Sequence, residues 1–465
     1  MSLHQYPDSP VFYRKLNRRF PLITKGEGCW LIDEDGKRYL DGSGGAFVAN
    51  IGHGVKEIGA AMAEQASKIA YLNGTAFTSQ PVEELAAELT TLAPGDLKKA
   101  YFLSSGSEAV EAALKLARQY WVETGKPSKH KIIALFPAYH GNTLLALSAS
   151  AREHYKTYYR EWLVDVVRIP APYSYRCECG GLRTEARAGV PACPICSGSA
   201  LEDAILRTGP ENVAAFIAEP VGGSSTGASV PAPGYFRRVR EICDKYKVLF
   251  IADEVLAGAG RTGTWSAIEP YGVIPDIQVL GKGITGGYAP LSAVLAPTRL
   301  LDPIAKGSGG LLHAQTFSHH PVLSATGLAA VRYIKKNGLV ERCAQMGKSF
   351  HKKLEQLRDL PHVGDVRGRG LLAGIEFVED KGSRTAFPRK QKFAERFADA
   401  ALEEGLMVWP NVGQANGTDG DLALLAPAFV ITEEEIDELV RRFSRALEKV
   451  SGVRYQGAAS LTPGT

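Results

Sequence analysis

A lysine enclosed by glycines follows an apolar segment of the chain. Lys282 stands between Gly281 and Gly283, directly after residues 277–280. A lysine removed from water has a lowered pKa, and its neutral amine is a nucleophile that can form a Schiff base with an aldehyde. The same pattern also fits a solvated lysine in a flexible loop. Lys282 is therefore a candidate catalytic residue if the fold buries it.

A second apolar segment ends in two carboxylates. Residues 249–252 run directly into Asp253 and Glu254. A carboxylate is costly to bury unless a cation or a strong donor faces it. The protonated nitrogen of a bound heteroaromatic ring would be such a partner for Asp253. The alternative is an aspartate that only caps the next turn.

Two further segments carry residue types that bind phosphate and aromatic rings. Ser105, Gly106 and Ser107 stand at a predicted strand-to-helix junction, where small residues let the backbone approach an anion and the helix dipole favours a phosphate. Tyr139 and His140 precede a glycine, and a ring placed there can stack on a flat heteroaromatic compound. Taken singly, the first segment also fits a simple helix cap, and the second fits ordinary core or surface aromatics.

Together these features form the set that pyridoxal phosphate requires: a phosphate cradle, a stacking ring, a buried aspartate and a lysine for the aldehyde. At this point the chain resembles the class III aminotransferases, which are pyridoxal-phosphate enzymes of fold type I. The resemblance runs from residues 28–36 to residues 424–427, nearly the whole chain. Its motifs follow the family's order and occupy residues 39–45, 52–54, 105–109, 139–141, 219–220, 253–255, 260–263 and 315–317.

The resemblance implies a role for each matching residue. Lys282 is expected to form the internal aldimine and to shuttle the proton between the substrate Cα and C4′ of the cofactor, while Asp253 pairs with the pyridinium nitrogen. Ser105, Gly106 and Ser107 are expected at the phosphate, and Tyr139 and Val255 on the two faces of the ring. Glu219 is expected at the ring hydroxyl, and Thr316 at the phosphate of the neighbouring subunit. His140, next to Tyr139 in the sequence, is also an expected cofactor contact. Since family members are dimers with active sites at the interface, we expect a homodimer or a higher homo-oligomer.

The substrate prediction depends on a departure from the family pattern. Many members bind the substrate carboxylate with an arginine of the C-terminal lobe, but residues 410–421 contain no arginine here. We therefore expect transamination from an amine or ω-amino acid to pyruvate or an aldehyde rather than to a dicarboxylate such as 2-oxoglutarate. The residue that binds the carboxylate is unassigned. Arg261 fits a structural role better, and Phe47 and Phe77 fit either an apolar substrate pocket or the core.

Two other interpretations stay open. The same scaffold supports aminomutases, decarboxylases and racemases, which a fold-level resemblance does not separate from transaminases. A binding or regulatory protein that works through a cysteine-rich insert is the third hypothesis, and the intact Lys282 and Asp253 weigh against it. The sequence identifies neither the amino donor nor the acceptor, and it does not distinguish a dimer from a tetramer.

A parallel sheet is the element that must position these motifs. Short apolar runs alternate with amphipathic helices, which is typical of an α/β protein, and the runs at 100–103, 131–135, 213–218, 248–252 and 277–280 predict buried strands. Ligands of open α/β sheets bind at the carboxyl ends of the strands, where the motifs stand. The last third predicts helices at 341–357 and 389–404, a half-exposed strand at 370–378, and a final helix that opens with a capping box at Thr432 and Glu435.

The predicted architecture is a large pyridoxal-phosphate domain with a mainly parallel central sheet covered by helices, plus a smaller α+β domain built from both ends of the chain. We expect the N-terminal part of the small domain at residues 1–60, the large domain at 61–325 and the C-terminal part of the small domain at 326–465.

Composition excludes several classes of protein. The 465 residues are 45% hydrophobic and 22% charged, as in an ordinary globular protein and unlike a disordered or coiled-coil chain. The formal charge of +4 is too small for a nucleic-acid or anionic-membrane binder of this length. No apolar run is long enough to span a membrane, and the first residues resemble no targeting signal. We therefore expect a cytoplasmic protein with small-molecule partners.

Four of the seven cysteines lie close together, within an expected insert at residues 173–200. Cys177 and Cys179 form a C-x-C pair, and Cys193 and Cys196 form a C-x₂-C pair. Four thiolates can close a tetrahedral zinc site, although C-x-C is a less usual half-site, and free thiols or a disulfide fit as well. Any metal would be structural, because four sulfurs leave no open position, so we assign no catalytic metal. The insert is expected on the surface of the large domain, away from Lys282.

Overall fold

The computed structural model describes residues 4–180, 185 and 192–452, and it has an α/β fold. A seven-stranded sheet forms its centre, with the order β4-β10-β9-β8-β7-β5-β6. Strand β10 is antiparallel to both of its neighbours and the other pairs are parallel, so the sheet is mainly parallel, as predicted. The strands are β4 (Lys99–Leu103), β5 (Lys131–Phe136), β6 (Val167–Pro170), β7 (Val213–Ala218), β8 (Leu249–Asp253), β9 (Ile277–Leu280) and β10 (Ser292–Ala296).

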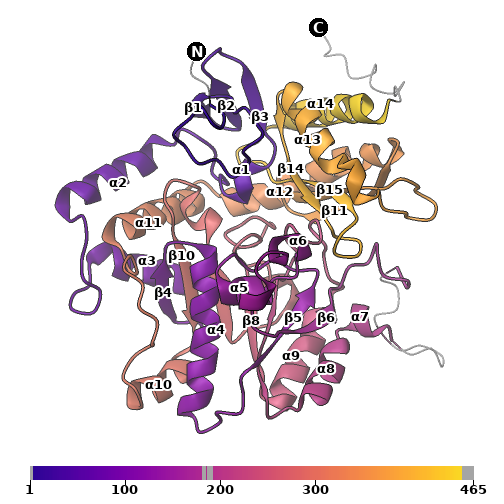
Figure 1. The fold of residues 1–465 in the computed structure, drawn as a ribbon. Coiled ribbons are helices and arrows are strands. Elements are labelled where there is room, and N and C mark those ends of the chain that lie inside the picture. Colours follow the sequence, from indigo (N-terminus) through magenta and orange to yellow (C-terminus); the bar gives the residue numbers. More distant parts are fainter. Residues whose placement is uncertain (1–3, 181–184, 186–191, 453–465) are drawn as a thin grey trace.

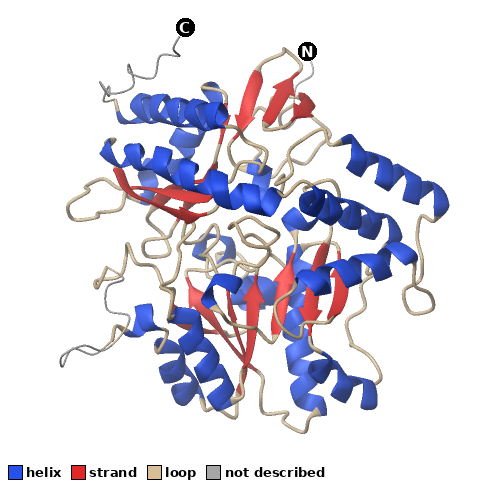
Figure 2. Cartoon of the chain, turned by 180° about the vertical axis from the view of Figure 1, so that it is seen from behind, coloured by secondary structure: helices blue, strands red, loops and turns tan. Residues whose placement is uncertain are grey.

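Helices cover both faces of this sheet (Figures 1 and 2). One face packs on α4 (Gly106–Glu123), α5 (Leu144–Ala149) and α10 (Thr298–Lys306), and the other packs on α8 (Ala200–Thr208) and α9 (Tyr235–Tyr246). Every residue of β7 and β8 is buried. Continuous apolar runs, rather than alternating ones, are what a strand covered on both faces requires.

The two ends of the chain meet above the central sheet, where Figure 1 shows the indigo N-terminal and the yellow C-terminal segments together. One small sheet has the order β1-β2-β3-β13, and the parallel pairing of β3 with β13 joins the two ends. A second sheet has the order β11-β12-β15-β14. These strands are β1 (Ile23–Glu27), β2 (Trp30–Asp33), β3 (Arg38–Asp41), β11 (Val363–Arg369), β12 (Leu372–Phe377), β13 (Leu406–Met407), β14 (Trp409–Val412) and β15 (Asp421–Leu425).

The remaining helices connect or cover these sheets. The predicted capping box opens α14: the Thr432 hydroxyl accepts from the Glu435 N–H, and the Glu435 carboxylate accepts from the Thr432 N–H. The α-helices are α1 (Gly44–Phe47), α2 (Lys56–Lys68), α3 (Gln80–Leu92), α6 (Glu153–Lys156), α7 (Pro194–Ser197), α11 (Pro321–Lys336), α12 (Leu339–Leu354), α13 (Phe393–Glu403) and α14 (Glu433–Ser451), and 3₁₀ turns lie at Arg160–Trp162, Glu269–Tyr271, Lys282–Thr285, Glu355–Asp359 and Arg389–Gln391. Among the described residues, no helix has the length and apolar character needed to cross a membrane.

The strand expected to be half-exposed is wholly buried, which corrects the sequence prediction. Strand β12 pairs with β11 on one side and β15 on the other. Phe377 packs against Phe397 of α13 and Phe443 of α14. On the opposite face, Gly374 lies so close to the loop at Gly227 that an added Cβ would stand 2.2 Å from the Gly227 carbonyl oxygen. Both faces are covered by parts of the chain that lie far away in sequence.

Boundaries predicted from sequence differ from the structure at several places. Strands β6 and β10 of the central sheet were not predicted, and the helix expected from residue 389 begins at Phe393 after a 3₁₀ turn. The expected domain boundaries at 60/61 and 325/326 fall within α2 and α11, which pack against each other. The exact division of the chain into domains remains a prediction. Residues 181–184 and 186–191 of the expected insert lie outside the described residues.

Candidate active site

The carboxyl ends of β4, β8 and β9 bring three of the motifs together. Asp253 ends β8, and its register partner Val279 stands three positions before Lys282. Leu103 at the end of β4 and Leu280 at the end of β9 pair with Ser292 and Ala293 at the start of β10. Because adjacent strands lie about 5 Å apart, the phosphate motif, the aspartate and the lysine share one edge of the sheet.

Lys282 lies at this edge and is partly buried. Its backbone has a left-handed φ of 45° at the start of a 3₁₀ turn, and its Nζ lies 5.3 Å from the centre of the Phe47 ring. Burial lowers the pKa of Lys282 to about 8, although the carboxylates of Asp253 and Glu219 act in the opposite direction. Near neutral pH, a useful fraction of this amine is therefore neutral and nucleophilic.

Asp253 is buried and uses its two carboxylate oxygens differently. Its Oδ1 accepts the Val255 N–H at 3.1 Å, which is the turn-capping bond of the alternative interpretation. Its Oδ2 lies 2.7 Å from Nδ1 of the buried His140, whose own backbone N–H donates to the Ser150 hydroxyl. His140 Nε2 has no protein partner among the described residues. The aspartate is thus both a turn cap and the carboxylate of a buried Asp–His pair.

A second buried carboxylate stands beside this pair. Glu219 Oε2 accepts the Tyr139 N–H at 3.3 Å, and Oε1 accepts the Gly223 N–H at 2.9 Å. Burial raises the pKa of Glu219 to about 7, and the nearby Asp253 adds to that rise. An added Cβ on Gly223 would lie 2.2 Å from Glu219 Oε1, so a larger residue there would require the carboxylate to move.

The start of α4 forms a cradle with the residues that fit a phosphate. Ser105 caps the helix, its hydroxyl accepting the Glu108 N–H, and Ser107 Oγ accepts the Asn142 N–H at 3.0 Å. A Cβ on Gly106 would stand 2.6 Å from Cγ1 of Val255, so the cradle closes tightly against that valine. The unpaired N–H groups at the N-terminus of this 18-residue helix suit an anion.

The structure places the remaining predicted residues as follows. Tyr139 is partly buried, and its hydroxyl accepts from Asn142 Nδ2 at 2.9 Å. Thr316 is exposed, in a segment held by Gln315, whose Nε2 donates to Ser104 Oγ and Glu108 Oε1 at 3.1 Å each. Within this single chain, Thr316 is therefore not enclosed with Lys282 and Asp253.

The two phenylalanines considered for a substrate pocket, Phe47 and Phe77, differ in burial. Phe47 is buried and contacts both the Trp409 ring, at 5.5 Å between centres, and Lys282. Phe77 is 66% exposed, in the loop between α2 and α3.

Arg261 is fully buried and donates through Nη1 to the carbonyls of Leu371 and Pro427 at 3.0 and 2.6 Å, which is a structural role.

Sequence reasoning missed a cluster of arginines beside the site. A cavity of about 720 Å³ has Gly45, Trp409, Arg14, Arg152 and Arg389 among its lining residues. Arg152 is the most informative of these, because it is 7% exposed and its Nε has no partner among the described residues. Its guanidinium lies 5.7 Å from the centre of the Tyr139 ring and donates to Ser224 Oγ at 3.3 Å. The sequence predicted no carboxylate-binding arginine, because residues 410–421 contain none and Arg261 fits a structural role, whereas Arg152 follows the Tyr139 motif.

These groups can hold a phosphorylated aromatic aldehyde: an anion cradle, a ring site beside Tyr139 and Val255, a buried carboxylate and a nucleophilic amine.

Comparison with known proteins identifies the family of the chain. The model of the family described as aminotransferase class III matches residues 13–447. An uncharacterized aminotransferase of Schizosaccharomyces pombe is 42% identical over 94% of both chains, and a putrescine–pyruvate aminotransferase of Pseudomonas aeruginosa is 34% identical over 94% of this chain and 93% of its own. The crystal structure of an omega transaminase of Pseudomonas jessenii in complex with PMP is similar with a TM-score of 0.84, at 30% identity over 93% of each chain.

Proposed function

The chain belongs to the class III aminotransferases, and on this premise we propose that it transfers an amino group from an amine or ω-amino acid to a 2-oxo acid, with pyruvate as the acceptor. The observation that carries the proposal is the position of Lys282. Its amine, with a pKa lowered to about 8 by burial, contacts Phe47, and Phe47 in turn packs on Trp409 of the cavity wall. The amine is therefore connected through Phe47 to the wall of a space large enough for a small organic substrate.

Class III aminotransferases use pyridoxal phosphate, and we propose that it is held by the residues that the family resemblance implies, whose geometry fits it. The Ser105, Gly106 and Ser107 segment would hold the phosphate at the start of α4, and Tyr139 and Val255 would hold the two faces of the ring. Glu219 would lie at the ring hydroxyl, Asp253 with His140 at the ring nitrogen, and Lys282 at the aldehyde. When bound, the cofactor supplies an aldehyde for the amine and a ring that stabilises negative charge at the substrate Cα.

The chain's own groups then move and hold protons. Asp253 keeps a proton on the ring nitrogen, because a buried carboxylate strongly favours a cation opposite it. His140 positions that carboxylate through its contact with Oδ2. Lys282 Nζ accepts the proton from the donor's Cα and later returns one, which an amine with a pKa near 8 can do at neutral pH.

Arg152 is our candidate for recognition of the acceptor's carboxylate. It lines the cavity, it lies against Tyr139, and its Nε lacks a protein partner among the described residues. A guanidinium fits a carboxylate with two parallel hydrogen bonds, which suits a short 2-oxo acid such as pyruvate. The apolar surface of Trp409, Val412 and Met407 on the cavity wall suits the carbon chain of an amine donor.

A homodimer or a higher homo-oligomer completes the proposal. The segment around Thr316 exposes large apolar side chains: Leu312 is 72% exposed and Phe317 is 51% exposed. Exposed apolar side chains gathered in one region are typical of a surface that a partner subunit covers.

A cytoplasmic location is supported by Cys29, Cys243 and Cys343, which are buried free thiols.

The test is a panel of donors and acceptors with the purified holoenzyme. Diamines, ω-amino acids and aryl-alkylamines are each paired with pyruvate and with 2-oxoglutarate, and alanine and glutamate are measured. We expect alanine formation that depends on both an amine and pyruvate. Preference for 2-oxoglutarate would overturn the acceptor assignment. Turnover of an amine or amino acid without any 2-oxo acid would instead support a mutase, decarboxylase or racemase.

A further inference from the structure

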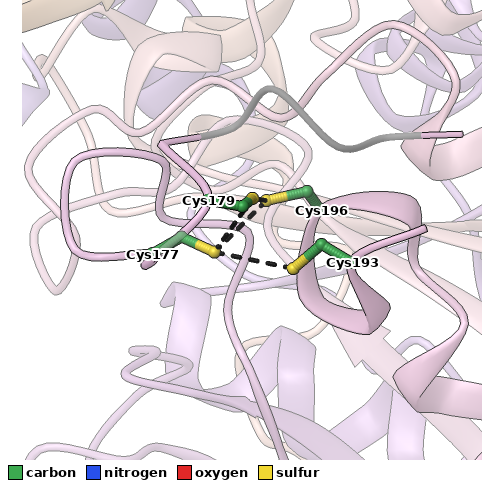
Figure 3. A group of neighbouring side chains, drawn as sticks. All are labelled: Cys177, Cys179, Cys193 and Cys196. Atoms are coloured by element: carbon green, nitrogen blue, oxygen red, sulfur yellow. Dashed lines mark hydrogen bonds between the residues drawn. The ribbon is translucent and has the colours of Figure 1, made fainter. Parts of the chain in front are cut away.

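Four cysteine sulfurs form a compact group outside the active site (Figure 3). The sulfur of Cys177 lies 3.4 Å from that of Cys179, 3.6 Å from that of Cys193 and 3.5 Å from that of Cys196. The sulfurs of Cys179 and Cys196 lie 3.3 Å apart, and all four lie within 4.8 Å of one another. Figure 3 shows these side chains converging from two separate stretches of chain.

The spacing identifies what this group can bind. Sulfurs in a disulfide lie about 2.05 Å apart, which is much closer than any pair here. Four thiolates around one zinc ion, each about 2.3 Å from the metal, lie about 3.8 Å from one another at the edges of a tetrahedron. The four separations given above are a few tenths of an ångström shorter than these edges, so a small outward movement of the sulfurs would admit the ion.

The surrounding backbone favours such a site. Cys177, Cys193 and Cys196 are buried, and among the described residues only Cys179 and Ile195 join them in this small cluster. Cys193 precedes α7 and Cys196 lies within it, so the second pair is fixed by a short helix.

We propose that Cys177, Cys179, Cys193 and Cys196 bind one structural zinc ion. Four thiolates without a histidine or a carboxylate are a soft donor set that selects zinc over magnesium, calcium or manganese. Binding displaces the thiol protons into solvent and involves no electron transfer. The site is closed, so the ion takes no part in catalysis.

The position of the group shows what the ion would stabilise. The residues just before Cys177 contact strand β12. Arg176 Nε donates to the Glu376 carboxylate at 2.7 Å, and the Tyr173 hydroxyl also hydrogen-bonds to Glu376. Helix α7, which carries Cys196, packs against α8 and α9 under the central sheet. The ion would therefore tie the segment that contacts the C-terminal sheet to the helices of the large domain.

The test uses the full-length holoenzyme purified without a histidine tag. Elemental analysis is expected to find about one zinc per chain, and the quadruple variant C177S/C179S/C193S/C196S is expected to lose it. The control variant Cys343→Ala removes a buried thiol elsewhere and should keep the zinc. Wild-type zinc well below stoichiometric amounts, or zinc that persists in the quadruple variant, would overturn the proposal.

Two measurements on the wild-type protein cover the case in which the quadruple variant does not fold. Replacement of zinc by cobalt should give the visible absorption of a tetrahedral four-thiolate site. Removal of the metal by a chelator should lower the melting temperature, and zinc should restore it. The intact mass, measured under non-reducing conditions, shows whether any of these cysteines form a disulfide. Such a disulfide would exclude the four-thiolate site.

Discussion

Asp253 Oδ2 lies 2.7 Å from Nδ1 of His140, although the two residues are 113 positions apart in the sequence. Both side chains are buried, and His140 is itself fixed by the bond from its backbone N–H to Ser150. A carboxylate held in this way cannot rotate to solvent. It therefore presents a fixed negative charge at the carboxyl end of β8, where it can pair with a cationic ring nitrogen.

The first prediction concerns this carboxylate. Asp253→Asn should lower kcat by about a hundredfold or more, because a neutral amide does not hold a proton on the ring nitrogen. Cofactor binding, followed by absorbance, should largely remain. Asp165→Asn is the control, since the Asp165 side chain is 81% exposed and pairs with Lys131 on the surface. A near-normal kcat for Asp253→Asn would show that this residue acts through its contacts with Val255 and His140 rather than through its charge.

The second prediction concerns Lys282. Lys282→Ala should abolish turnover and retain the fold, since no other amine replaces this nucleophile. Borohydride reduction should attach the cofactor to the peptide that contains Lys282. With a pKa of about 8, the amine becomes neutral as the pH rises through 8, so the rate of cofactor capture by the apoprotein should rise with a midpoint there. Labelling at a different lysine would disprove the assignment, and the exposed Lys25→Ala variant should behave as wild type.

The third prediction concerns the phosphate cradle. Gly106→Ala should weaken cofactor binding, because the new Cβ would stand 2.6 Å from Val255 Cγ1. The second substitution Val255→Ala should recover part of that loss, which identifies the contact as the cause. Gly59→Ala is the control, since a Cβ at Gly59 meets nothing within 4 Å. Equal cofactor affinity for wild type and Gly106→Ala would exclude a tight cradle. Titration with pyridoxal phosphate measures each affinity.

The fourth prediction concerns substrate recognition. Arg152→Met should raise KM for pyruvate about tenfold or more and change KM for the amine donor much less, because only the acceptor brings a carboxylate in every pairing. Arg152→Lys should restore binding only in part, since lysine lacks the planar fork. The control is Arg160→Met, whose guanidinium is exposed and pairs with Glu153. An unchanged KM for pyruvate would show that Arg152 does not bind the acceptor's carboxylate, and another arginine of the cavity would then be tested.

The fifth prediction concerns pH and stability. Glu254 is fully buried, and burial raises its pKa from 4.5 to about 7 even though it accepts the N–H groups of Ala267 and Ile268. A raised carboxyl pKa means that the folded state binds the extra proton between these values. Its contribution to stability is therefore fully present below pH 4.5 and is lost as the pH rises through 7.

Glu254→Gln, which keeps an acceptor but not the titration, isolates this contribution. The melting temperature of wild type relative to the variant should fall between pH 5 and pH 8. A difference that stays constant with pH would show that Glu254 does not titrate in this range.

The sequence alone determined the features that depend on near neighbours. The capping box at Thr432 and Glu435 is made by residues three positions apart, and it begins α14 where predicted. The unbroken apolar run at 213–218 identified β7 with correct bounds, because a strand covered on both faces needs no polar positions. The glycines around Lys282 and the serines at 105 and 107 marked the strand ends, and the order of the motifs identified the family.

Only the tertiary structure decided the contacts that join distant segments. The Asp253–His140 pair depends on how the loop after β5 folds over the end of β8, and Arg152 reaches Tyr139 only through the turn that follows α5. The strand β12 has the alternating pattern of a half-exposed strand, yet packing against α13, α14 and the Gly227 loop buries it. Burial also sets the pKa of Lys282 and of Glu254. Local sequence encodes hydrogen bonds and periodicity within a few residues, whereas desolvation and side-chain convergence arise only when separate elements pack together.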